Sequence, residues 1–450
     1  MTHRIANKRR LTTAIAALGA AALLATTAAC GTAGPTSSTT PGDTGSTAGT
    51  TASVWILSGV TQQPFEDSFQ RWDTAHPDQA FTSEAFANDP YKQKIAAAIG
   101  TGQAPTLIYG WGGGGLRTYV QANAVIDLSD VMADPDISSR FLPSVAAVGE
   151  VDGKYYAVPN NGMKPVMIYY NKDLFAQVGV SVPTTWDDLM ADVPKFLAAG
   201  IAPFSVAGQA QWPLLPYFAY LVDRIGGPTV MANIAANQAN AWSDPAVADA
   251  LTKIQDLVNA GGFVKGFASI STDAGADVAL LYTGKAAMDL GLPSTFQTIM
   301  TGDPDFINQG KLGFAEFPAV TGGKGDPKDV TGNPSNYWSI SASATPGQVA
   351  TAKQYIKEQL LTPQYAADLL SVGNVPPAAG IDAQLAASSN ADYYTLLYNM
   401  VKDAPNFQLS LDQYLSPAVG TALLTNLQQI FLMQSTPQQF VDAMNATIGQ

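Results

Sequence analysis

Cysteine and histidine, on which nucleophilic triads and zinc sites commonly depend, are scarce in this chain. The 450 residues include one cysteine, Cys30, and two histidines, His3 and His76. A Ser-His-Asp triad in the folded body would depend on His76 alone, and a common zinc site would lack its cysteines and a second histidine. Acidic residues are plentiful, so a pair of catalytic carboxylates remains open, but no motif indicates one.

Three tryptophans lie in segments that follow or enter predicted strands, where a ring can meet a ligand. Trp111 lies in the loop YGWGGGGL (109–116), and glycines such as Gly112 let the backbone approach a ligand closely. Trp212 follows a polar stretch after a strand, and Trp338 enters a strand after a loop rich in glycine and proline. Aromatic rings in such places can stack on a flat ligand face. Packing into the core is the open alternative for Trp111 and Trp212.

Polar residues gather at the same strand ends and could donate or accept hydrogen bonds. Asn88 and Asp89 precede Pro90, where the alternative role is capping of the next helix. The segment NNGMK (160–164) could equally be a turn favoured by Asn-Gly. The candidate ligand-binding residues are Ser58, Asn88, Asp89, Trp111, Gly112, Asn161, Met163, Lys164, Trp212, Gly291, Asn336, Trp338 and Asp412.

The elements that must position these residues alternate between strands and helices. Short apolar runs at 53–57, 80–86 and 106–109 predict strands, and residues 63–76 and 90–100 between them predict helices. This order is typical of a parallel sheet covered by helices, whose ligands bind at the carboxyl ends of the strands. The alternation resumes after residue 166, and the chain becomes mainly helical after residue 341. We therefore expect two α/β lobes and a helical C-terminal section.

Composition restricts the partners of the chain. The formal net charge is −13, and only 13% of the residues are charged. An acidic surface repels phosphate backbones, so we expect no nucleic-acid partner. Residues 31–52 consist almost entirely of Gly, Thr, Ser, Ala and Pro, a composition that predicts a disordered tether.

The N-terminus has the order of an export signal. Basic residues precede an apolar stretch at about 11–25, and small residues follow up to Cys30. This arrangement resembles the lipobox of bacterial lipoproteins, although Thr27 stands where leucine is usual. The resemblance implies a signal peptide over 1–29, lipid attachment at Cys30 and a tether over 30–52. The alternatives are a signal peptide with an incidental cysteine and a transmembrane anchor. The anchor is disfavoured because about 15 apolar residues are too few for a membrane span.

Several segments of the body resemble a known family in their order and spacing. The segments are GKYYAVP (153–159), IYYNKDLF (168–175), PTTWDDL (183–189), SDP (243–245) and GKAAM (284–288). Together they resemble bacterial extracellular solute-binding proteins, in particular the sugar-binding group that serves ABC importers. Thr185 is expected to cap the helix that starts at Trp186.

The resemblance implies a two-lobed fold of the periplasmic-binding-protein type, with α/β sandwich lobes linked by a hinge. We expect one lobe from 53–161 plus 306–345 and the other from 162–305 plus 346–450. A sugar, a disaccharide or longer, would lie in the cleft, and hinge closure would present it to an ABC permease. The segment around Asp412 resembles one in the oligosaccharide binders of this family. Gly291 begins a segment in which relatives often carry a tryptophan, and this chain lacks that tryptophan.

The sequence therefore favours a binding protein without catalysis or cofactor, anchored outside the cell by lipid and acting as a monomer. A secreted glycosidase with paired carboxylates is the main alternative. A surface adhesin is a third possibility.

Overall fold

The computed structural model describes residues 50–449. The predicted signal peptide, Cys30 and most of the predicted tether lie outside these residues. The tether was predicted to extend to residue 52, and this end is corrected: β1 begins at Ala52, and the Nε2 of Gln348 donates to the Thr51 carbonyl over 3.0 Å. Among the described residues, none of the helices has both the length and the apolar character that crossing a bilayer requires.

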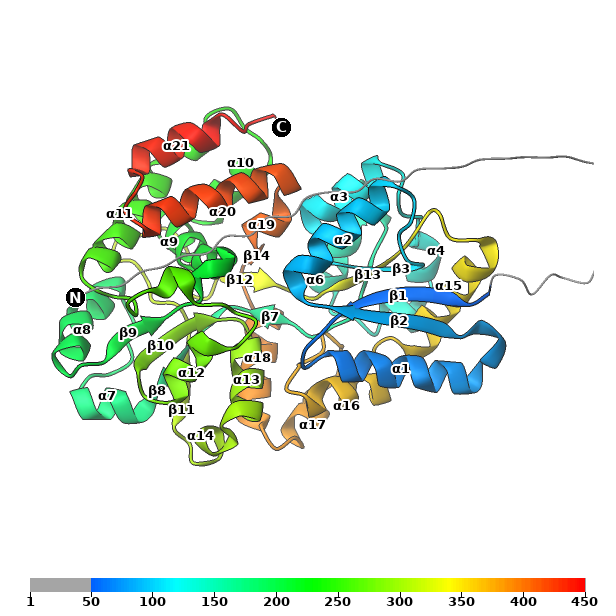
Figure 1. The fold of residues 1–450 in the computed structure, drawn as a ribbon, viewed down its shortest axis with the longest axis horizontal. Coiled ribbons are helices and arrows are strands. Elements are labelled where there is room, and N and C mark those ends of the chain that lie inside the picture. Colours follow the sequence, from blue (N-terminus) through cyan, green and yellow to red (C-terminus); the bar gives the residue numbers. More distant parts are fainter. Residues whose placement is uncertain (1–49, 450) are drawn as a thin grey trace, which may run out of the picture. The chain divides into compact units, whose positions relative to one another are not determined.

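A five-stranded sheet forms the core of the first lobe, in the order β2-β1-β3-β13-β6 (Figure 1). Its strands β1, β2 and β3 run parallel; β13 pairs antiparallel with β3, and β6 pairs antiparallel with β13. The helix α1 covers it with Phe65, Phe69 and Trp72, which the 3.6-residue period places on one face. The predicted alternation is confirmed, with bounds β1 Ala52–Leu57, α1 Gln62–Ala75, β2 Phe81–Phe86, α2 Asn88–Gly100, β3 Leu107–Gly110, β6 Val158–Pro159 and β13 Tyr337–Ile340.

A four-stranded sheet forms the core of the second lobe, in the order β11-β8-β10-β9. The central strand β10 pairs antiparallel with β8 and parallel with β9. Thr185 caps α8 as predicted, in a capping box with Asp188. The elements of this lobe are β8 Met167–Asn171, α7 Lys172–Val178, α8 Trp186–Ala198, β9 Ala202–Ser205, α9 Leu215–Gly226, α10 Pro228–Ala235, α11 Pro245–Asn259, α12 Ala276–Tyr282, β10 Ala286–Gly291, α13 Ser294–Gly302, α14 Pro304–Asn308 and β11 Leu312–Ala315.

A small third sheet lies between the two larger ones in Figure 1, in the order β14-β12-β7. Its strands are β7 Lys164–Pro165, β12 Val330–Asn333 and β14 Phe407–Leu409. The chain leaves the first lobe through 160–164 and returns to it through 333–337. A backbone bond from Asn160 N to Asn336 O (2.8 Å) joins the two crossings, and one from Met163 N to Val375 O (2.8 Å) joins the first crossing to the segment that follows α16.

Two segments lie in a different lobe from the one predicted. The strand β11 was expected in the first lobe, but it pairs with β8 in the second sheet. The helices α15 (Pro346–Gln359) and α16 (Pro363–Ser371) were expected in the second lobe, but they pack against α1 and β1. Both placements result from strand pairing and helix packing between segments that are far apart in the sequence. Local sequence patterns contain no information about such contacts.

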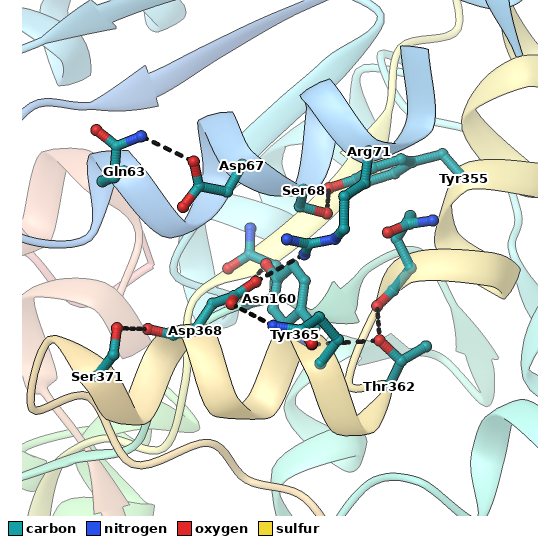
Figure 2. A network of polar contacts seen from close by, with 12 residues as sticks. Gln63, Asp67, Ser68, Arg71, Asn160, Tyr355, Thr362, Tyr365, Asp368 and Ser371 are labelled. Atoms are coloured by element: carbon teal, nitrogen blue, oxygen red, sulfur yellow. Dashed lines mark hydrogen bonds and ion pairs between the residues drawn. The ribbon is translucent and has the colours of Figure 1, made fainter. Parts of the chain in front are cut away.

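Polar contacts fix α15 and α16 to the first lobe (Figure 2). The hydroxyls of Ser68 and Tyr355 lie 2.9 Å apart, and Arg71 forms an ion pair with Asp368 at 2.7 Å. Tyr365 donates its hydroxyl hydrogen to the carbonyl of Asn160 over 2.6 Å. These contacts tie the helices both to α1 and to the start of the first crossing.

The C-terminal section is helical, as predicted. Its last helices pack into the core of the second lobe through residues such as Leu427 and Phe440. The helices after residue 380 are α17 Asp382–Ala386, α18 Ala391–Lys402, α19 Leu411–Tyr414, α20 Pro417–Phe431 and α21 Pro437–Asn445; the last three belong to this core, and α17 and α18 pack with residues of the first-lobe core. Short elements of the first lobe are α3 Gly113–Gln121, α4 Ser129–Met132, α5 Pro135–Ser138, α6 Pro143–Ala146, β4 Glu150–Val151 and β5 Lys154–Tyr155.

Candidate functional site

Two adjoining cavities lie where the carboxyl ends of β1, β2 and β3 face the second lobe. We call the first the strand-end cavity; its volume is about 550 Å³, and it is lined by residues that follow these strands, such as Ser58, Asn88 and Trp111. The second, the helix-side cavity, has about 730 Å³ and lies among α2, α3 and α20. They share the lining residues Lys92, Trp111, Trp212, Asp412 and Gln413. The residues that follow β1, β2 and β3 were expected to meet at one cleft, and Ser58, Asn88 and Trp111 do so in the strand-end cavity.

Trp111 and Trp212 are the aromatic side chains common to both cavities. Trp111 is half-buried and meets Tyr91 and Tyr109 edge to face, with ring centroids 5.9 and 5.5 Å apart. The ammonium of Lys92 lies 5.1 Å from the centroid of a Trp111 ring. Trp212 is also half-buried, in a short 3-10 turn of the second lobe. The cleft therefore has a ring from each lobe, each with part of its surface open.

The glycine run after Trp111 serves the protein's own packing more than ligand approach. Gly112 has φ +76°, and a Cβ there would lie 2.6 Å from the Cγ1 of Val148. A Cβ on Gly114 would collide with the backbone carbonyl of Leu415. Arg117, one turn later, donates to the carbonyl of Tyr414. The run thus lets α3 lie directly on the segment 413–415, although Gly112 and Gly115 also line the helix-side cavity.

Several predicted polar residues do line the cleft. Ser58, Asn88 and Lys164 line the strand-end cavity, and Asp89 lines the helix-side cavity. Asn88 donates to the Oδ1 of Asp89 over 2.9 Å, within the first turn of α2. Ala87, not Asp89, is the N-cap residue of that helix, so the capping role is not seen.

Asp412 borders both cavities. Burial raises the pKa of this carboxyl, and the ammonium of Lys92 opposes that effect. The Nε2 of Gln413 donates to its Oδ2 over 2.7 Å.

Asn161 lines the strand-end cavity, but its side chain is fully engaged within the protein. Its Nδ2 donates to the Tyr109 hydroxyl (3.1 Å) and to the Oδ1 of Asn336 (3.2 Å). Its Oδ1 accepts from the backbone N–H of Gly162 (2.8 Å) and from the side chain of Asn374. An amide has two donor hydrogens and two acceptor lone pairs, so no capacity remains for a ligand. Asn161 therefore joins the first crossing to the second and to the segment after α16, which corrects its expected role as a ligand contact.

The structure also corrects Trp338 and Met163. Trp338 is fully buried among Phe65, Phe69 and Tyr109, with ring centroids 5.5, 6.4 and 5.6 Å away. It lies opposite Tyr109 in the antiparallel pair, on the face covered by α1. Met163 is likewise fully buried. The core of the first lobe, not the cleft, contains both side chains.

Gly291 belongs to a smaller cavity of about 110 Å³ that also touches Trp212. A Cβ on Gly291 would collide with the Oγ1 of Thr295, so a larger residue does not fit without movement. The same cavity contains Asp289, whose Oδ2 accepts from the Thr295 hydroxyl over 2.8 Å. Burial and the nearby Asp277 raise the pKa of Asp289 to about 8. This carboxyl is therefore mostly protonated at neutral pH.

Sequence reasoning missed several residues that line the strand-end cavity. Lys92 carried a signal, because it follows Asn88 by four residues on α2 and so shares its face. Thr331 and Asn333 carried none, since only the pairing of β12 with β7 brings them to the cleft. Asn336, which was predicted, lies in the same lining.

The sequence and the fold were compared with those of known proteins. A family model of bacterial extracellular solute-binding proteins matches residues 58–366. An ABC transporter extracellular-binding protein of Pyrococcus horikoshii is 23% identical over 246 residues, which are 52% of this chain and 53% of that protein. An sn-glycerol-3-phosphate-binding periplasmic protein of Yersinia pestis is 29% identical over 34% of this chain and 39% of its own. The matches to these curated relatives span between about two fifths and half of their length.

Solved structures match over a larger part. A protein studied for xylan utilization by the thermophilic bacterium Caldanaerobius polysaccharolyticus has a TM-score of 0.80 and 27% identity, and the match covers 89% of this chain and 100% of that one. A chitin oligosaccharide binding protein has a TM-score of 0.78 and 24% identity, with 88% and 98% covered. The second likeness supports the two-lobed fold alone.

Proposed function

Since the chain belongs to the family of bacterial extracellular solute-binding proteins, we propose that it captures a carbohydrate in the cleft between its lobes. The observation that carries the proposal is the pair of half-buried rings, Trp111 and Trp212, which border both cavities from opposite lobes. Sugars present C–H faces that stack on such rings and hydroxyls that bind the polar groups at the strand ends.

The size of the cleft supports an oligosaccharide. The two cavities have volumes of about 550 and 730 Å³ and adjoin at Trp111 and Trp212. A drug-sized ligand typically fills a pocket of about 300–1,000 Å³. A chain of two or more sugar units could therefore extend from the strand ends past Trp111 towards α3 and α20. The similarity to a protein studied for xylan utilization favours a xylo-oligosaccharide as the first probe.

The receptor would release its ligand to an ABC permease. The basic, apolar and small residues that precede Cys30 support export and lipid attachment at that cysteine. The composition of 31–49 supports a flexible tether between lipid and body. In this proposal the protein acts outside the cell as a monomer and carries out no catalysis. Mass spectrometry of the mature N-terminus should find a diacylglyceryl group on Cys30. An unmodified thiol would contradict the lipid anchor but not the capture of a carbohydrate.

Calorimetry with purified protein tests the sugar proposal. The probes are xylobiose to xylohexaose, with chitotetraose, maltotetraose and raffinose as comparators. We expect saturable binding of one sugar per protein, and chromatography of the mixture should show no shortened product. Absence of binding to every probe would sink the proposal, and release of product would favour the glycosidase alternative.

A further inference from the structure

Lys164 and Asn333 face the strand-end cavity from neighbouring strands of the small central sheet. They are register partners in the antiparallel pair of β7 and β12. Residues directly opposite in such a pair project to the same side of the sheet, with Cβ atoms about 5 Å apart. Both line the strand-end cavity. The donor group of Lys164 and the acceptor oxygen of Asn333 therefore lie next to each other in the lining of the strand-end cavity.

Each of these side chains has a buried polar atom that no other described residue satisfies. Within residues 50–449, the Nζ of Lys164 and the Oδ1 of Asn333 make no hydrogen bond. Asn333 is only 8% exposed. Leaving buried polar atoms unpaired is costly, and proteins commonly accept such a cost at functional sites. The two atoms differ in kind, because an ammonium can only donate and an amide oxygen can only accept.

We propose that Lys164 and Asn333 together bind one hydroxyl group of a neutral sugar. The ammonium would donate to the hydroxyl oxygen, and the hydroxyl hydrogen would be donated to the Oδ1 of Asn333. One hydroxyl both donates and accepts, so it satisfies both buried atoms at once. This assignment rests on the proposed function and narrows the ligand to one with a free hydroxyl, and no acidic group, at this position.

An anionic ligand group fits the same place poorly. A carboxylate or phosphate would accept from Lys164, but it would place negative oxygen against the Oδ1 of Asn333. Besides Lys164 itself, the charged side chains that line this cavity are Lys92, Asp273 and Asp412. Two of these three side chains are acidic and would repel an anionic group of the ligand. A hydroxyl brings no such repulsion.

The charge state of Lys164 offers an independent readout. Burial lowers the pKa of this amine to about 7. Above that pH the free protein holds the amine neutral, so binding through the ammonium must take up a proton. Affinity for a neutral sugar should therefore fall as the pH rises from 6 to 9. Replacing Lys164 should remove this part of the pH dependence, whereas any part due to Asp412 would remain.

The experiment compares Lys164→Met and Asn333→Leu with the wild type and with Lys172→Met, whose lysine is exposed on α7. Melting is measured without ligand, and calorimetry uses the neutral xylo-oligosaccharide that the wild type binds best and its glucuronic-acid-substituted counterpart. We expect Lys164→Met to raise the melting temperature, because it removes a buried amine that has no hydrogen-bond partner among the described residues. Both cleft variants should weaken binding of the neutral sugar at least tenfold, and Lys172→Met should change neither quantity.

The outcomes separate this assignment from the proposed function. Binding that both cleft variants leave intact, or a melting temperature that falls with Lys164→Met, would overturn the assignment and leave a sugar receptor. Tighter binding of the acidic sugar than of the neutral one would show an anion site instead. If the wild type bound no sugar at all, the proposed function and this assignment would fail together.

Discussion

Trp111 and Trp338 are the same residue type, and both were expected in the cleft, but the structure separates them. Trp111 follows β3 and keeps part of its ring open beside Lys92. Trp338 lies within a strand and is buried between that sheet and α1. A ring that binds ligand and a ring that fills the core respond differently to truncation.

Trp111→Ala should weaken sugar binding by about 2 kcal/mol, or about thirtyfold, because aromatic anchors dominate such sites. Its effect on melting without ligand should be small by comparison. Trp338→Ala is the matched control and should cost about 3–5 kcal/mol of folding free energy, because it opens a cavity in the core. Calorimetry and chemical denaturation of both variants check this pair. A loss of stability in Trp111→Ala as large as that in Trp338→Ala would identify Trp111 as a core residue.

These residues mark the limit of sequence reasoning at this scale. Strand ends rich in Gly, Asn and Trp predicted the lining by Ser58, Asn88 and Trp111, because the carboxyl ends of parallel strands converge. The burial of Trp338 depends on the antiparallel pairing with β3 and on the helix that covers it, which lie far away in the sequence. The saturation of Asn161 likewise depends on partners up to 213 residues away.

At the scale of elements, the start of α3 depends on its contact with the segment 413–415. Gly114 meets the backbone of Leu415, whereas the position of a Cβ on Gly115 has no neighbour within 4 Å among the described residues. The two glycines are adjacent on one helix but differ in what they touch. The glycine run was predicted to let the backbone approach a ligand, but Gly113 and Gly114 approach this segment of the protein instead.

Gly114→Ala should destabilise the protein by about 1–3 kcal/mol, because the added methyl group forces the backbone of Leu415 to move. Gly115→Ala should be neutral or stabilising by up to about 1 kcal/mol, as expected when alanine replaces glycine in an open helical position. Denaturation curves of the two variants measure the difference. Equal effects would contradict the assigned role of Gly114 in docking α3.

At the scale of the whole folded body, the crossings between lobes form a small bonded node. Asn161, in the first crossing, binds Asn336 of the second crossing and Asn374, which follows α16. Members of such families close their lobes on ligand by hinge motion. The node is placed where the relative orientation of the lobes would change.

Addition of a saturating sugar should therefore make the protein more compact. Small-angle X-ray scattering should show a smaller radius of gyration with ligand than without, at an unchanged mass equal to one chain. Raffinose, or any probe that fails to bind in calorimetry, serves as the control for solvent contrast. If the radius of gyration stayed the same with sugar bound, the lobes would not close on the ligand. Lobe closure could then not be the signal by which a permease distinguishes the loaded form.

The sequence by itself determined the alternation of strands and helices, the helical C-terminal section and the segments that form the cleft. Hydrophobic period, capping residues and turn residues are local, so they can be seen in one chain. The tertiary structure alone decided which lobe contains β11, α15 and α16, which tryptophan meets the cleft, and that Asn333 lies beside Lys164. Those outcomes arise from pairing and packing between distant segments, which no local pattern encodes.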